Sequence, residues 1–188
     1  MIYRFSKWVY KISNGWIALG AVLLFLMFSI FVLPSQSTKV DSISEHVGTP
    51  DLSFYYSKND IYRMADAYGE EGRALYIQAR FTFDLIWPIV YSLFLTTCIS
   101  WIYRQISLID SNFGRVNLIP IMALFFDYFE NVSTSLIMFR YPEQTPVLDM
   151  LAPIFTMLKW TLVILSFLLL IVGFIILLRT RIQQRRAI

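Results

Sequence analysis

Four apolar stretches alternate with polar segments along the chain, at residues 16–33, 81–103, 116–139 and 151–178. A transmembrane helix needs about 17–25 mainly apolar residues to cross the hydrocarbon core of a bilayer. Each stretch meets that length. Because the loops that join the last three stretches are short, these helices should pack as antiparallel neighbours. The pattern therefore predicts an all-α polytopic membrane protein with a bundle of four transmembrane helices.

The first apolar stretch has one feature of a signal peptide, since Arg4, Lys7 and Lys11 precede it. The apolar region of a signal peptide has about 7–15 residues and is followed by a cleavage site of small residues. The stretch 16–33 exceeds that length, and the Val-Leu-Pro-Ser sequence at 32–35 is a poor cleavage site. We therefore expect the stretch to be retained as a membrane anchor.

The polar segment 34–80 predicts a helical cap between the first two spans. Ser57 and Asp60 have the spacing of a capping box, which marks the start of a helix. Apolar residues then recur at positions i, i+3, i+4 and i+7 of an amphipathic helix. They are Ile61, Met64, Ala65 and Tyr68. Gly69 interrupts this helix, and we expect a second helix to follow it and to run straight into the second span. The cap would shield the mouth of the bundle or, alternatively, act as a lid that gathers substrate.

Charge placement predicts the orientation in the membrane. Segments 1–15, 104–115 and 179–188 together hold nine Lys and Arg residues and one acidic residue, whereas 34–80 and 140–150 hold six Lys and Arg residues and nine acidic ones. Loops rich in Lys and Arg stay in the cytoplasm. We therefore expect both termini to be cytoplasmic, the cap to be extracytoplasmic, and the protein to reside in the plasma membrane. The sequence pI of about 9.0 follows from this arrangement and does not indicate a nucleic-acid partner.

The amino-acid composition excludes several kinds of functional site. Only 15% of the residues are charged, whereas soluble domains average about 25%, so the lipid bilayer is the expected partner of most of the chain. Cys98 is the single cysteine and His46 the single histidine. One cysteine excludes an internal disulfide or a CxxC redox pair. One histidine in a loop excludes bis-His haem and HExxH zinc sites within one chain. The sequence predicts neither a metal nor a cofactor.

Four ionisable residues interrupt the apolar stretches: Asp84, Asp127, Glu130 and Lys159. Each costs about 2.5–3.5 kcal/mol at the centre of a membrane helix, so it should face protein or water and mark a functional site. Residues that are three or four apart share a face of a helix. On the third span the polar face consists of Asp127, Glu130, Asn131 and Thr134. The opposite, apolar face consists of Phe125, Phe129, Val132 and Leu136.

Depth in the membrane indicates which charged residues meet. At a rise of 1.5 Å per residue, Glu130 lies about 13 Å from the outer end of its span and Lys159 about 12 Å from the outer end of its own. We therefore predict a Glu130–Lys159 ion pair, which could also be a purely structural link between helices. Asp84 is predicted to pair with Arg80 at the outer rim. Asp127 lies about 18 Å deep. One lysine neutralises one carboxylate, so Asp127 should be protonated or compensated by another group.

Proline and small residues indicate where the spans approach one another. Pro88 has no N–H for the carbonyl of Asp84, so a kink there leaves an acceptor beside a carboxylate. In the last stretch, small and polar residues line one side and permit close contact between helices. They are Thr156, Lys159, Ser166 and Gly173.

Three motifs carry a resemblance to a known group of proteins. They are Tyr68-Gly-Glu-Glu-Gly-Arg73 with Tyr76, Asp84-x3-Pro88-x2-Tyr91, and Asp127-x2-Glu130-Asn131, preceded by the run Asp51-Leu-Ser-Phe-Tyr-Tyr-Ser57. This pattern resembles that of an uncharacterised family of four-span bacterial integral membrane proteins, over most of the chain. The resemblance implies that these residues act together, and it implies no activity.

We expect a polar intramembrane cavity between the second, third and fourth spans that binds a small lipophilic or lipid-derived molecule. The expected ligand-binding residues are Arg73, Arg80, Asp84, Tyr91, Asp127, Glu130, Asn131 and Lys159. In an enzymatic version, Asp127 or Glu130 would be the acid or base. Two alternatives remain open. The protein could be a proton or cation conductor that uses the carboxylates in series, or a structural or accessory subunit in which the charges pair the spans.

Overall fold

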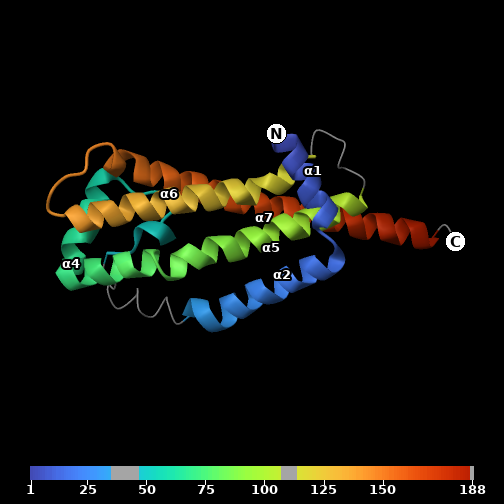
Figure 1. The fold of residues 1–188 in the computed structure, drawn as a ribbon, viewed down its shortest axis with the longest axis horizontal. Coiled ribbons are helices and arrows are strands. Elements are labelled where there is room, and N and C mark those ends of the chain that lie inside the picture. Colours follow the sequence, from blue (N-terminus) through green and yellow to red (C-terminus); the bar gives the residue numbers. More distant parts are fainter. Residues whose placement is uncertain (35–46, 107–113, 187–188) are drawn as a thin grey trace. The chain divides into compact units, whose positions relative to one another are not determined.

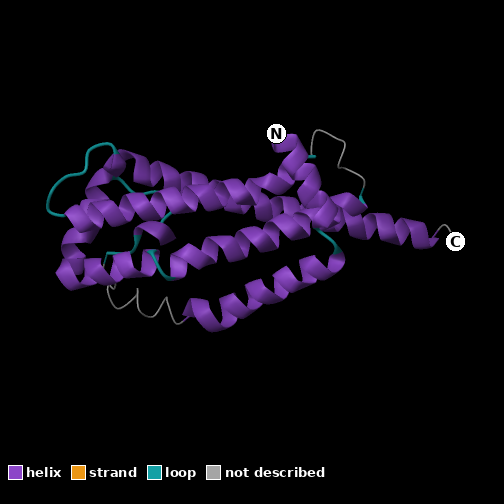
Figure 2. Cartoon of the chain, in the orientation of Figure 1, coloured by secondary structure: helices purple, strands orange, loops and turns teal. Residues whose placement is uncertain are grey.

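The computed structural model describes residues 1–34, 47–106 and 114–186, and this part of the chain is helical, with short turns and no strand (Figure 2). The main helices in chain order are α1 (Ile2–Ile12), α2 (Gly15–Met27), α4 (Lys58–Arg80), α5 (Phe83–Gln105), α6 (Ile119–Arg140) and α7 (Leu148–Arg186) (Figure 1). Short helical turns occur at Phe28–Val32, Pro50–Leu52 and Val116–Leu118. The all-α prediction is confirmed. His46 and Asp110 lie outside the described residues.

Three segments are long and apolar enough to cross a membrane: Gly15–Val32, Lys58–Gln105, which comprises α4 and α5, and Leu148–Arg185. They support the prediction of a membrane protein. Helix α6 is not among them. Its length is sufficient, but it carries Asp127, Glu130 and Asn131, and the run Ser133-Thr134-Ser135 follows them. These polar residues lower the mean hydropathy of the helix.

The chain forms two compact units. Unit 1 comprises Met1–Leu26, Val90–Met122 and Leu162–Ile188, and unit 2 comprises Met27–Ile89 and Ala123–Thr161. Helices α5, α6 and α7 each contribute one part to unit 1 and the other part to unit 2.

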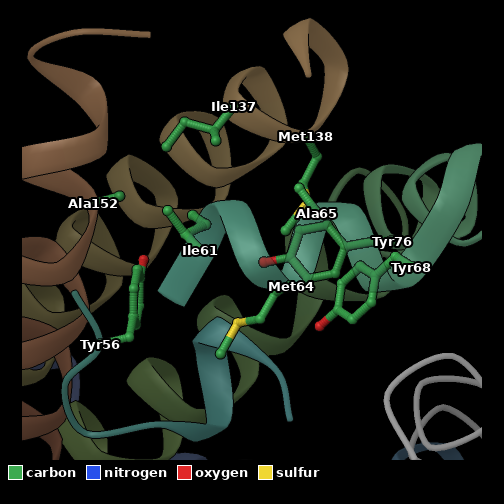
Figure 3. Close-up of a cluster of buried hydrophobic side chains, with 9 residues drawn as sticks. All are labelled: Tyr56, Ile61, Met64, Ala65, Tyr68, Tyr76, Ile137, Met138 and Ala152. Atoms are coloured by element: carbon green, nitrogen blue, oxygen red, sulfur yellow. The ribbon is translucent and has the colours of Figure 1, made fainter. Parts of the chain in front are cut away.

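The core of unit 2 forms where the first half of α4 packs on the C-terminal end of α6 and the start of α7. The capping box is confirmed, since the Ser57 hydroxyl accepts from the backbone N–H of Asp60 and the Asp60 carboxylate accepts from the backbone N–H of Ser57. The predicted apolar stripe is buried and contacts Ile137, Met138 and Ala152 (Figure 3). The amphipathic pattern is therefore explained by burial against these two helices. The members of the core that Figure 3 labels are Tyr56, Ile61, Met64, Ala65, Tyr68, Tyr76, Ile137, Met138 and Ala152.

Gly69 kinks α4, as the sequence predicts. Its φ of 63° and ψ of −177° lie in a backbone region that is essentially restricted to glycine. The Arg73 guanidinium stabilises the kink, because Nη1 donates to the carbonyl of Ala65 (2.9 Å) and the group lies over the Tyr141 ring. The prediction that the second helical segment runs straight into the next span is wrong. Helix α4 ends at Arg80, and a turn at residues 81–82 separates it from α5.

Unit 1 is held together by one buried amide and by close contacts of small residues. The Asn117 side chain donates to the carbonyl of Ser6 in α1 (3.3 Å) and to the hydroxyl of Ser100 in α5 (3.1 Å). Gly173 of α7 lies against Tyr103 of α5, so closely that a Cβ at this position would be 2.6 Å from the tyrosine ring. The predicted close approach along this side of the last span is confirmed at Gly173.

Candidate functional site, a buried charge cluster

Helix α6 separates its polar and apolar faces as the sequence predicts. The residues of its polar face, Asp127, Glu130, Asn131 and Thr134, are all buried. Those of its apolar face, Phe125, Phe129, Val132 and Leu136, are all exposed. Side chains three or four apart lie on the same face of a helix, so Asp127 and Glu130 point into unit 2 and Phe125 and Phe129 point outward.

The predicted ion pair between Glu130 of α6 and Lys159 of α7 is confirmed. The Glu130 side chain is only 1% exposed and that of Lys159 7%. The Thr156 hydroxyl, one turn before Lys159, donates to Oε1 of Glu130 (2.7 Å). Tyr56 lies 3.3 Å from the same hydroxyl. Burial, followed by the charge of Glu130, raises the pKa of Tyr56, so its hydroxyl stays protonated and can donate.

Arg80 lies between two carboxylates. Its Nε is 3.1 Å from Oδ2 of Asp84, which confirms the predicted pair, and its Nη2 is 3.2 Å from Oδ2 of Asp51. The guanidinium also lies over the Tyr76 ring, 4.6 Å from the centroid. The Arg80 side chain is buried, with only 3% of its surface exposed. Two carboxylates and an aromatic ring provide the partners that a buried guanidinium requires.

The proline in α5 creates a polar contact with α6. Pro88 cannot donate to the carbonyl of Asp84, and this carbonyl instead accepts from Nδ2 of Asn131 (3.4 Å). The same Nδ2 lies 3.2 Å from Oδ1 of Asp127. The next carbonyl of α5, that of Leu85, accepts from the Tyr128 hydroxyl (2.8 Å). The expected acceptor beside the Asp84 carboxylate is therefore present, and α6 uses it.

Sequence reasoning did not assign Asp51 or Tyr56 to the site. Both belong to the segment 47–57 that precedes α4, and the carbonyl of Asp51 accepts from the indole N–H of Trp160 (3.0 Å). Burial opposes ionisation of the Asp51 carboxyl, but Arg80 and then Lys159 outweigh it and hold its pKa below the ordinary value. A signal was present, because both residues lie in the polar and aromatic run that is part of the family resemblance.

Arg73, one of the predicted ligand-binding residues, contacts the carbonyl of Ala65 within α4 and the ring of Tyr141. These contacts stabilise the kink of α4. Tyr91 is buried in unit 1. Arg73 differs from the prediction because the kink at Gly69 redirects its segment.

We use the name charge cluster for six residues of unit 2, Asp51, Arg80, Asp84, Asp127, Glu130 and Lys159. The charge of Asp127 acts on both Lys159 and Glu130. The charge cluster thus has four carboxyl groups and two bases. The carboxyl groups outnumber the bases, and such an excess favours protons or a cationic group within the cluster. Within the described ranges, no three His, Cys, Asp or Glu side chains are grouped so as to hold a metal ion.

Comparison of the chain with protein-family models, with curated proteins and with solved structures finds no match. The charge cluster is therefore the basis of the functional argument.

Proposed function

We propose that the protein is a multi-pass protein of the plasma membrane in which α2, α5, α6 and α7 are the four transmembrane helices. The three apolar segments support this, and so does α6, which exposes an apolar face of the kind that contacts lipid and buries its polar one. The distribution of Lys and Arg supports cytoplasmic termini and an extracytoplasmic cap made by segment 34–80.

We further propose that the charge cluster binds a small lipophilic molecule that carries a positive charge, such as a protonated amine. The observation that carries this proposal is the surplus of carboxyl groups over bases within a buried cluster. A buried charge is stable only when an opposite charge or hydrogen bonds compensate it. A cationic ligand would supply that compensation.

Asp84 and Asp127 are the two carboxyl groups to which we assign the ligand's cation. They lie on α5 and α6, and the Asn131 amide contacts both the Asp84 carbonyl and the Asp127 carboxyl group. A cation beside the two carboxyl groups would be attracted by both. The ligand should otherwise be apolar, because the apolar helices that surround the cluster reject additional polar groups.

Mass spectrometry of small molecules that co-purify with the protein tests this function. We expect the wild type to retain a cationic lipophilic molecule and Asp127→Asn to lose it. Glu70→Gln, which removes an exposed carboxylate from the same unit, is the matched control and should retain the molecule. Equal retention by wild type and Asp127→Asn, or retention by neither, contradicts the proposal.

The same variants distinguish the alternatives. A proton or cation flux in liposomes that Asp127→Asn abolishes would replace ligand binding with conduction. An accessory role would be favoured if Asp127→Asn and Lys159→Met both failed to accumulate in the membrane while Glu70→Gln accumulated normally.

A further inference from the structure

We propose that unit 1 binds an anionic phospholipid, with one acyl chain in an apolar cavity between α2, α5 and α7 and with the phosphate against the basic residues at one end of that cavity. This site is independent of the charge cluster, since all its residues belong to unit 1.

The cavity has a volume of about 610 Å³, within the range of about 300–1,000 Å³ that is typical of small-molecule sites. Its lining is apolar and comes from all three helices, with Val22 of α2, Phe94 of α5 and Leu170 of α7 among its residues. Leu19 and Phe174, which also line it, are about half exposed. The cavity therefore opens onto an apolar surface and admits hydrocarbon.

Small residues of α2 explain why the cavity exists. Of the two buried residues of α2, Ala18 and Ala21, Ala18 lines the cavity, and its short side chain leaves room there. The helix approaches α5 closely at Gly15, where a Cβ would be 3.4 Å from the Trp101 indole, and again where Phe25 stacks on Phe94 at 4.5 Å. The cavity lies along α2 between and beside these contacts.

Basic residues gather at the Gly15 and Trp101 end of the cavity. Arg104 follows Trp101 by three residues, and its Nη1 is 3.5 Å from the carbonyl of Lys11, which precedes Gly15 by four residues. Arg181 of α7 donates to the side chain of Gln105, next to Arg104. Unit 1 has nine Lys and Arg residues and a single acidic residue. A phosphate at this end would meet exposed cationic groups and little opposing charge.

Size and charge favour a phospholipid over a second protein chain. A single acyl chain is narrow and flexible and has no polar groups that the apolar lining would leave without hydrogen bonds. The apolar lining offers no partner for the backbone of an extended peptide. The basic end selects an anionic headgroup.

Native mass spectrometry and thermal unfolding of delipidated protein test the site. The probes are phosphatidylglycerol and phosphatidylcholine with identical acyl chains, and inorganic phosphate alone. We expect phosphatidylglycerol to be retained about tenfold better than phosphatidylcholine and to raise the unfolding temperature, with no effect of inorganic phosphate. Equal retention of the two lipids, or stabilisation by inorganic phosphate alone, would overturn the proposal.

Two pairs of variants separate the acyl-chain and headgroup contributions. Val22→Trp fills the cavity and should abolish retention, whereas Leu23→Trp adds the same side chain at an exposed neighbour outside the lining and should not. Arg104→Gln should remove the preference for phosphatidylglycerol, whereas Arg140→Gln, an exposed arginine of unit 2, should leave it intact. The unfolding temperature without lipid checks that each variant is folded. Retention by folded Val22→Trp, or an unchanged preference in Arg104→Gln, would refute the site.

Discussion

Unit 1 and unit 2 carry their charges in opposite ways. Unit 1 has nine Lys and Arg residues and one acidic residue, and each of its Lys and Arg side chains whose burial is described is exposed. Unit 2 has seven Lys and Arg residues and twelve acidic ones, and Arg80, Glu130 and Lys159 are nearly inaccessible. Charged residues therefore have different roles in the two units. In unit 1 they lie on the surface, and in unit 2 several of them form part of the interior.

The difference predicts where stability depends on charge. An exposed ion pair contributes about 0–1 kcal/mol, whereas removing one partner of a buried pair costs about 3–5 kcal/mol, because the other charge remains buried without compensation. Substitutions of charged residues should therefore be severe in unit 2 and mild in unit 1, and substitutions that alter packing should matter in both.

The largest effect is expected for Lys159→Met, which leaves Glu130 buried without its cation. We expect the free energy of unfolding to fall by about 3–5 kcal/mol, measured by denaturant titration in mixed micelles. Adding Glu130→Gln should restore a substantial part of this loss, so that the double variant is more stable than the sum of the single effects predicts.

Arg181→Met is the matched control for Lys159→Met in unit 1. Its side chain is exposed and bonds to Gln105, so its effect should stay within about 0.5 kcal/mol. Two results would contradict the contrast between the units. One is that the unfolding free-energy changes of Lys159→Met and Glu130→Gln are strictly additive. The other is that Arg181→Met destabilises the protein as much as Lys159→Met does.

Asp51→Asn should have a smaller and pH-dependent effect. Because the folded-state pKa of Asp51 is held below its ordinary value, its contribution is present above the pKa of the unfolded state and is lost as the pH falls through the folded-state pKa. We expect a loss of about 1.5–3 kcal/mol at pH 7. Unfolding titrations across the acid range should show the difference from wild type disappearing. A difference that is independent of pH would mean that Asp51 acts through packing and not through its charge.

The smallest of the three expected changes in stability concerns two glycines of unit 1, and it tests how tightly α5 and α7 pack. Gly173→Ala places a Cβ 2.6 Å from the Tyr103 ring, and overpacking of this kind costs about 1–3 kcal/mol. Gly20→Ala is the control, since a Cβ there meets no atom within 4 Å, and alanine favours a helix by about 0.5–1 kcal/mol. Thermal unfolding should show opposite signs. Equal changes in unfolding temperature for the two variants would mean that α7 can move away from Tyr103 of α5 without a loss of stability.

Periodicity and depth were sufficient to predict part of the site. The helical spacing of Asp127, Glu130 and Asn131 predicted their common buried face, and matched depths predicted the Glu130–Lys159 pair. The proline rule predicted the free acceptor at Asp84. These successes share a cause, since each depends on the regular geometry of the α-helix.

The remaining site residues could not be predicted because they depend on irregular parts of the backbone. Asp51 reaches Arg80 from a segment without a repeating pattern, so no helical spacing relates the two residues. Arg73 was expected to bind ligand, but the kink at Gly69 directs it to Ala65 and Tyr141. The Arg80–Asp84 pair follows from helical spacing, whereas the second partner of Arg80, Asp51, lies outside any helical repeat.

Access of charged reagents to the charge cluster is the most direct test of the central claim, that unit 2 contains an acid-rich site shielded from lipid. In a Cys98→Ser background, Asp127→Cys and Phe125→Cys place a thiol on the buried and the exposed face of α6. Reconstituted protein is treated with positively and negatively charged methanethiosulfonates. We predict that Asp127→Cys reacts at least about tenfold faster with the cationic than with the anionic reagent, because the carboxyl groups of the charge cluster attract cations. Phe125→Cys lies on the exposed face that we propose to contact lipid, and it should react with neither reagent. Equal rates for the two reagents at position 127, or no more reaction there than at position 125, would contradict the account.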